Sequence, residues 1–141
     1  EVKRTGNVSS TLGGYFRSAA MLPVISDFLF DDAPDVLREL SLLNATHDVF
    51  LIMVDSAFAF ELPSVSAGWI QVLDVETGGT RTISRREYLA LADRVREWQT
   101  SVQAVAKDLD LDVVRLGLDQ AKSDIALSEF VAERRLRKVY A

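Results

Sequence analysis

The sequence predicts an α/β fold: a partial doubly wound parallel sheet with helices on both faces and an inserted β-hairpin. An apolar run at 22–28 is followed, after a helical pattern, by a nearly unbroken apolar run at 48–55. Strand, helix and strand in close succession are typical of a βαβ unit, whose crossover is almost always right-handed. A shorter apolar run at 112–117 adds a third core strand. Together these runs predict three parallel strands wrapped by helices.

The composition indicates one globular segment spanning 1–141. The chain is 48% apolar and 26% charged, the usual balance of a folded domain of this length. A net charge of −5 opposes nucleic-acid binding. The chain has no cysteine, which excludes thiol catalysis and thiolate metal sites and is consistent with a cytoplasmic location. No apolar run approaches the roughly 18 residues of a membrane span, so we expect no membrane insertion of this segment.

The first core strand is expected at about 21–27, where Ser26 and Asp27 stand at its carboxyl end. Open α/β sheets bind ligands beyond the carboxyl ends of their strands. Asp27 is therefore a candidate ligand of a hard cation such as Mg²⁺. The preceding stretch, 8–17, has a helical spacing of apolar residues weakened by glycines, which predicts only a poor helix.

The next helix is expected to start at Asp31-Asp32-Ala33-Pro34, because an aspartate can cap free amides and proline suits the first turn. It is expected to close at 44–46, before the second strand at 48–55. Asp55 ends that strand as Asp27 ends the first, so both carboxylates are expected on one rim of the sheet. There they would share a cation or a proton, and Asp31 and Asp32 would be further oxygen ligands of the cation. In the alternative, Asp55 is a solvated strand end, and Asp31 and Asp32 only cap the helix.

A hairpin is expected from strands at 69–75 and 80–83, because Gly78 and Gly79 suit a tight turn. Ser84 and Glu87 form a capping-box pattern. The long helix that follows has an apolar stripe that faces the core or a partner, made of Tyr88, Leu91, Val95, Trp98, Val102, Val105 and Leu109. Trp98 is expected in the core, and Trp69 of the hairpin less so.

The strand at 112–117 is expected near an edge, because Arg115 interrupts it. Ser123 is expected to cap a final helix whose last turns carry a basic cluster at 134–138. The cluster would be a solvated helix end, or it would contact an acidic partner or anionic lipid. His47 is the only histidine, which excludes a serine–histidine triad and a two-histidine zinc site. No glycine-rich phosphate loop is present, so nucleotide binding is unsupported.

Four motifs occur in a family's order: Val24-Ile25-Ser26-Asp27-Phe28-Leu29, His47-Asp48-Val49, Glu61-Leu62-Pro63 and Asp74-Val75-Glu76-Thr77-Gly78. From about Leu12 to Arg137 the chain resembles the C-terminal half of the DUF58 proteins, which are similar to von Willebrand factor type A (vWA) domains. In such domains an Asp-x-Ser-x-Ser turn, a threonine and an aspartate hold a metal ion. By position Asp27 resembles that aspartate, but the turn is absent here, so the site is incomplete in this segment and Mg²⁺ would be a cofactor of a fuller protein.

The resemblance implies a binding adaptor and not an enzyme, with a MoxR-type AAA+ ATPase as a protein partner in assembling or activating other proteins. It also implies that the parent protein can be membrane-anchored. In a vWA-like sheet the strand at 21–27 pairs with a strand that is absent here, and a bare edge invites pairing with another chain. We therefore expect a homo-oligomer through this edge. Two alternatives are a metal-dependent hydrolase or phosphoryl-transfer domain using Asp27 and Asp55, and a structural oligomer through the stripe at 88–109.

Overall fold

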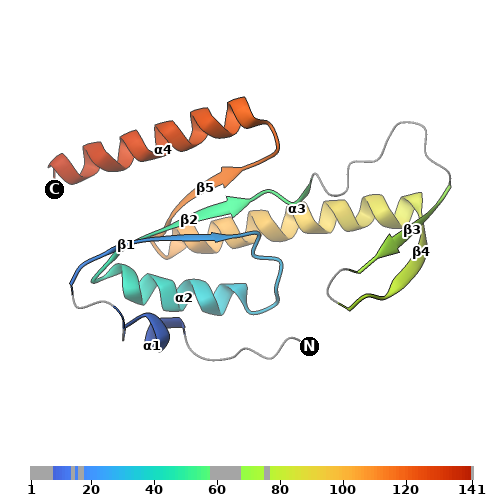
Figure 1. Cartoon of the computed structure of the whole chain (residues 1–141), viewed down its shortest axis with the longest axis horizontal. Helices are drawn as coiled ribbons and strands as arrows, with labels where there is room; N and C mark the ends of the chain where they lie inside the picture. Colours follow the sequence, from blue (N-terminus) through green and yellow to red (C-terminus); the bar gives the residue numbers. More distant parts are fainter. Residues whose placement is uncertain (1–7, 14, 16–17, 58–67, 75–76, 141) are drawn as a thin grey trace.

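A computed structural model describes residues 8–13, 15, 18–57, 68–74 and 77–140 (Figure 1). Its centre is a three-stranded parallel sheet in the order β1-β2-β5, formed by β1 (Met21–Ser26), β2 (Asp48–Val54) and β5 (Asp112–Leu116). A separate antiparallel pair is formed by β3 (Trp69–Leu73) and β4 (Thr80–Ser84). The predicted α/β class, the parallel strands and the inserted hairpin are confirmed. So is the edge position of β5, the strand interrupted by Arg115.

Helices cover both faces of the sheet: α1 (Val8–Gly13), α2 (Ala33–Asn44), α3 (Arg85–Asp108) and α4 (Gln120–Tyr140). α2 and α3 pack on one face, and α4 runs along the other side of β5, separated from α2 by the sheet (Figure 1). The hairpin lies beside the amino-terminal end of α3. α1 packs on α2. It is short, in agreement with the poor helix predicted at 8–17.

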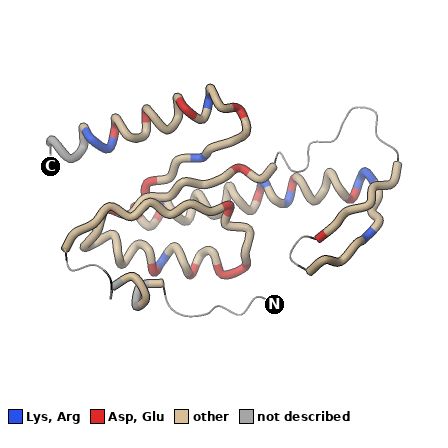
Figure 2. Tube along the Cα trace, in the orientation of Figure 1, with Lys and Arg blue, Asp and Glu red and all other residues tan. Residues whose placement is uncertain are grey.

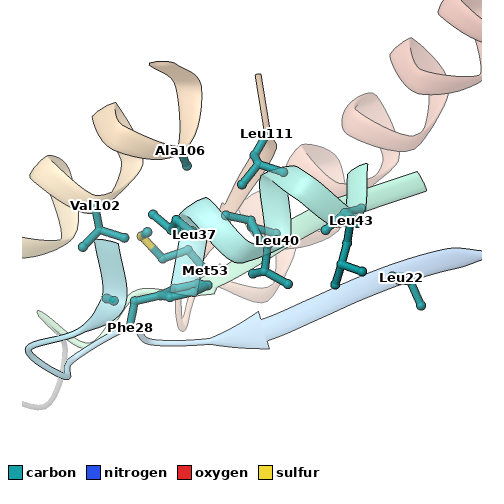
Figure 3. Close-up of a cluster of buried hydrophobic side chains, with 12 residues drawn as sticks. Leu22, Phe28, Leu37, Leu40, Leu43, Met53, Val102, Ala106 and Leu111 are labelled. Atoms are coloured by element: carbon teal, nitrogen blue, oxygen red, sulfur yellow. The ribbon is translucent and has the colours of Figure 1, made fainter. Parts of the chain in front are cut away.

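The core lies between the sheet and the pair α2 and α3 (Figure 3). Alternate residues of β2 point into it, because side chains alternate between the two faces of a strand. The helices add residues at helical spacing. The fully buried members include Leu37, Leu40, Val49, Leu51, Met53 and Val102. This single cluster fixes where the strand ends meet α3.

Two predicted helix caps differ from the structure, although α2 starts where it was expected. α4 begins three residues before Ser123, and the cap is Asp119, whose Oδ1 accepts the amide of Lys122 at 3.2 Å. Ser123 instead bonds Gly117, where its hydroxyl donates to the carbonyl oxygen at 2.9 Å. Asp32 does stand at the N-cap of α2, but its side chain makes no capping hydrogen bond, because its backbone is not in the extended conformation that aims a cap at the helix amides.

The other local signals are confirmed. The Ser84 side chain accepts the Glu87 amide at 3.2 Å, and the Glu87 carboxylate accepts the Ser84 amide at 2.7 Å, which completes the capping box. In the hairpin turn Gly78 has φ of 70°, the conformation for which glycine was expected there.

Candidate functional site

The carboxyl ends of β1 and β2 lie on one rim, because the two strands are parallel neighbours in register from Met21↔Asp48 to Ser26↔Met53. Asp27 follows β1 and Asp55 follows β2, as the sequence predicts. Asp55 faces a cation of the chain itself: its Oδ2 accepts Nε of Arg115 at 3.1 Å, and its Oδ1 lies 3.1 Å from Nη2 of the same guanidinium. Asp55 is therefore a partner of Arg115 rather than a solvated strand end, and its two oxygens are engaged.

A buried glutamine of α3 ties the same rim together. Gln99 is fully buried, and its Nε2 donates to the carbonyl oxygens of Asp27 at 2.9 Å and Val54 at 2.8 Å. Its Oε1 accepts from Nη2 of Arg115 at 3.0 Å and from the Ser56 amide at 3.4 Å. One side chain thus joins the ends of β1 and β2 to α3 and to β5.

The environment of Asp55 lowers its pKa. Partial burial raises the pKa of this carboxyl, but the Ala57 amide, donating at 2.9 Å, and the Arg115 guanidinium outweigh that effect. The net result is a pKa below the usual value for aspartate. The lowered pKa favours the carboxylate form of Asp55, which does not suit a pair in which Asp27 and Asp55 share a proton.

The loop after β1 is held in an unusual conformation. Phe28 has φ of 55°, which is rare for a bulky residue, while its side chain is almost fully buried. Its amide donates to the Ser26 hydroxyl at 3.0 Å, and its carbonyl accepts from Nε1 of Trp98 at 2.7 Å. Trp98, expected in the core, is half-buried and packs against it. These contacts fix the backbone beside Asp27.

Asp27 is half-buried, and its Oδ1 accepts the Leu29 amide at 3.2 Å. Within the ranges described by the structure, no group of three or more His, Asp or Glu residues is placed to hold a metal ion. Asp27 as a metal ligand therefore stays a prediction.

At the opposite end of the sheet, Arg134 of α4 joins the first residues of two strands. Its guanidinium donates to Asp112 at the start of β5 and to Asp48 at the start of β2. It also stacks over the ring of Phe50, 4.7 Å from the centroid, and lies 5.5 Å from the ring centroid of Phe130. The prediction of a solvated basic helix end is wrong for Arg134, which docks α4 onto the sheet.

The outer edge of β1 is open along the described part of the chain. The Asp48 amide donates to the Ala20 carbonyl at 2.8 Å, so in the alternating pattern of a strand the even-numbered residues of β1 face β2. Met21, Pro23 and Ile25 face the open edge, where Pro23 has no N–H to offer. Met21 and Ile25 are 64% and 66% exposed. The predicted bare edge is present, and its one proline sits where a missing donor is tolerated.

The remaining predicted residues have other roles. His47 Nδ1 accepts the Ala20 amide at 3.3 Å, a packing role as expected. Trp69 is 70% exposed. The most buried line of α3 runs through Ala92, Val95, Gln99, Val102 and Ala106, and it packs on the chain's own core. The stripe expected at 88–109 flanks this line and shares Val95 and Val102 with it.

Sequence reasoning missed two residues of this arrangement, Gln99 and Arg134. A signal existed for Gln99, since it lies at helical spacing between Val95 and Val102 in an otherwise apolar line. For Arg134 the sequence shows a basic cluster but no partner. The motif Glu61-Leu62-Pro63 and residues 75–76 lie outside the described residues.

Comparison with known proteins gives one family. The family model described as "Protein of unknown function DUF58" matches residues 5–107. Neither a curated protein nor a solved structure gives a significant match. In the part of the chain that the structure describes, no helix is both long enough and apolar enough to cross a membrane.

Proposed function

This chain belongs to the DUF58 family, and from that premise we propose that it is a non-enzymatic protein-interaction segment of vWA-like architecture. We propose that its partner is a protein of the MoxR-type AAA+ ATPase class. The observation that carries the proposal is the open edge of β1, where exposed apolar side chains stand beside backbone groups that pair with no other described strand.

The rim supports binding rather than catalysis. Catalytic residues of α/β enzymes lie at the carboxyl ends of the strands. Here the polar side chains at that place bond to the chain itself: Asp55 pairs with Arg115, and Gln99 donates to the ends of two strands. These bonds make a rigid platform that holds the Phe28 loop. No described feature favours the metal-dependent hydrolase, because Asp55 already has a cationic partner.

The edge of β1 suits a strand from a partner. Met21 and Ile25 offer both N–H and C=O groups to the open side, and Pro23 offers its carbonyl. A strand beside β1 would lie next to the exposed apolar side chains of Met21 and Ile25, so a segment with apolar side chains on that face is the best fit. Symmetric pairing of β1 with a second β1 is less favourable, because two prolines would then lie near the axis. The homo-oligomer through this edge remains a prediction.

The test measures binding of the chain to a purified MoxR-type AAA+ ATPase from the same organism, by biolayer interferometry. Ile25→Lys places a charge on the proposed surface and should weaken binding about tenfold or more, while circular dichroism shows an unchanged fold. Leu42→Lys is the matched control, because Leu42 is 73% exposed on α2, away from β1. Wild-type chain that does not bind, or equal loss in both variants, would contradict the proposal.

A further inference from the structure

α4 has an apolar side that no described part of its own chain covers. Its docked side carries Phe130 and Arg134, which contact Phe50 of β2. On the other side Ile125 is 59% and Leu136 58% exposed, although buried positions are the rule for such side chains. Figure 1 shows α4 beside β5 at the outside of the molecule, with no described helix or strand beyond it. The helix therefore has two apolar sides, one docked on the sheet and one exposed to solvent.

The exposed residues form a stripe. Their spacing alternates mainly between four and three, as in the seam of a two-helix pair: Ala121, Ile125, Ser128, Ala132 and Leu136. Ser128, Ala132 and Leu136 line an open groove along the helix. The small residues at the middle of the stripe allow a second helix to approach closely.

The charges of α4 are arranged end to end. Figure 2 shows acidic residues prevailing over its first half and basic residues at the carboxyl end of its described part. The first half carries Asp124 and Glu129 with one base, Lys122. In the second half Arg134 is docked on the sheet, while Glu133 and Arg135 are exposed. On the flank of the stripe that carries Asp124 and Arg135, two antiparallel copies bring the acid of one against the base of the other, whereas two parallel copies bring like charges together. The charge pattern is thus complementary to itself under a twofold axis.

We propose that α4 is the docking surface for a second copy of this chain. The two α4 helices pack antiparallel about a twofold axis, with Ser128 of each copy beside Ala132 of the other. In this register Asp124 of one copy lies beside Arg135 of the other, on one flank of the stripe. The stripe itself contacts neither the rim nor β1, although Arg135 on its flank lines a pocket with Met21 at the start of β1.

The expected dimer is weak and sensitive to salt. A single helix face buries less than the roughly 800 Å² per partner of a standard stable interface, so we expect a dissociation constant in the micromolar range or above. The flanking ion pairs are exposed, and added salt screens them. Dimer should therefore grow with protein concentration and decline with ionic strength.

Sedimentation equilibrium from about 10 μM to about 1 mM, the range in which an interface of this size associates, tests the proposal. Ala132→Glu should abolish the dimer while circular dichroism shows intact helix. Asp124→Arg and Arg135→Glu should each weaken it at least severalfold, and the double variant should restore it. A chain that stays monomeric throughout, or a dimer indifferent to Ala132→Glu, would overturn the proposal.

The register has its own test, because the chain contains no cysteine. Ser128→Cys and Ala132→Cys chains are mixed and oxidised, and the products are resolved by mass spectrometry. Antiparallel packing predicts that the mixed disulfide between positions 128 and 132 forms in preference to either homodisulfide. Preference for the two homodisulfides would indicate parallel packing and would refute the proposed arrangement.

Discussion

Replacing Gln99 with leucine should lower the stability of the fold by removing hydrogen bonds at the rim of the sheet. The substitution keeps the approximate size of the side chain but removes donation to the Asp27 and Val54 carbonyls at 2.9 and 2.8 Å. A buried acceptor without a partner costs about 1–3 kcal/mol, so the two carbonyls together predict a loss of about 2–6 kcal/mol. Domains of this kind have total stabilities of about 5–15 kcal/mol, so the loss is large.

Urea denaturation followed by circular dichroism measures this loss. With a slope of about 2 kcal/mol/M, a loss of about 3 kcal/mol lowers the midpoint by about 1.5 M at unchanged slope. Gln103→Leu is the matched control: Gln103 is half-buried one turn later on the same helix. A surface change of that kind stays within about 0.5 kcal/mol. Gln99→Leu with a loss below about 1 kcal/mol, or equal to that of Gln103→Leu, would refute the assigned role of Gln99.

Three further predictions concern charged groups. Arg134→Lys keeps the charge but loses the planar guanidinium that joins Asp48 to Asp112. It should lower the free energy of unfolding, measured by urea denaturation, by about 1–3 kcal/mol and should speed amide exchange in α4. Unchanged exchange would contradict the docking role of Arg134. The pKa of Asp55 is lower in the folded state than the unfolded value of about 3.9, so the stability that this carboxylate contributes is present above that pH and is lost as pH falls through the folded pKa. Asp55→Asn should therefore flatten the profile of stability against pH between about pH 2 and 5. An unaltered profile would count against the role assigned to Asp55. Millimolar Mg²⁺ should leave the melting temperature of the wild-type chain and of Asp27→Ala unchanged, whereas a rise that Asp27→Ala abolishes would show that this segment binds the metal by itself.

The features predictable from the sequence were those set by neighbouring residues. The run at 48–55 is apolar because β2, the central strand, is covered on both faces, and the structure places this run and the run at 22–28 in the sheet. The Ser84 capping box needs only residues three apart. Local chemistry of this kind is readable before any fold is known.

The features that were missed depend on contacts between distant segments. Arg134 finds its carboxylates at Asp48 and Asp112, and nothing in the local sequence links the three. Gln99 meets Arg115 and the strand ends only when α3 crosses the rim. The cap of α4 was misplaced because Asp119 and Ser123 are both good capping residues, and packing of Ser123 against Gly117 decides between them.

Amide hydrogen exchange along β1, resolved by NMR, tests most directly the claim that this strand is an open binding edge. The amides of Leu22 and Val24 face β2 and should exchange slowly, whereas those of Met21 and Ile25 should exchange fast in the free chain and slow down when the ATPase is bound. Equal protection of all four amides in the free, monomeric chain would mean that the edge is already covered, and the account would fail.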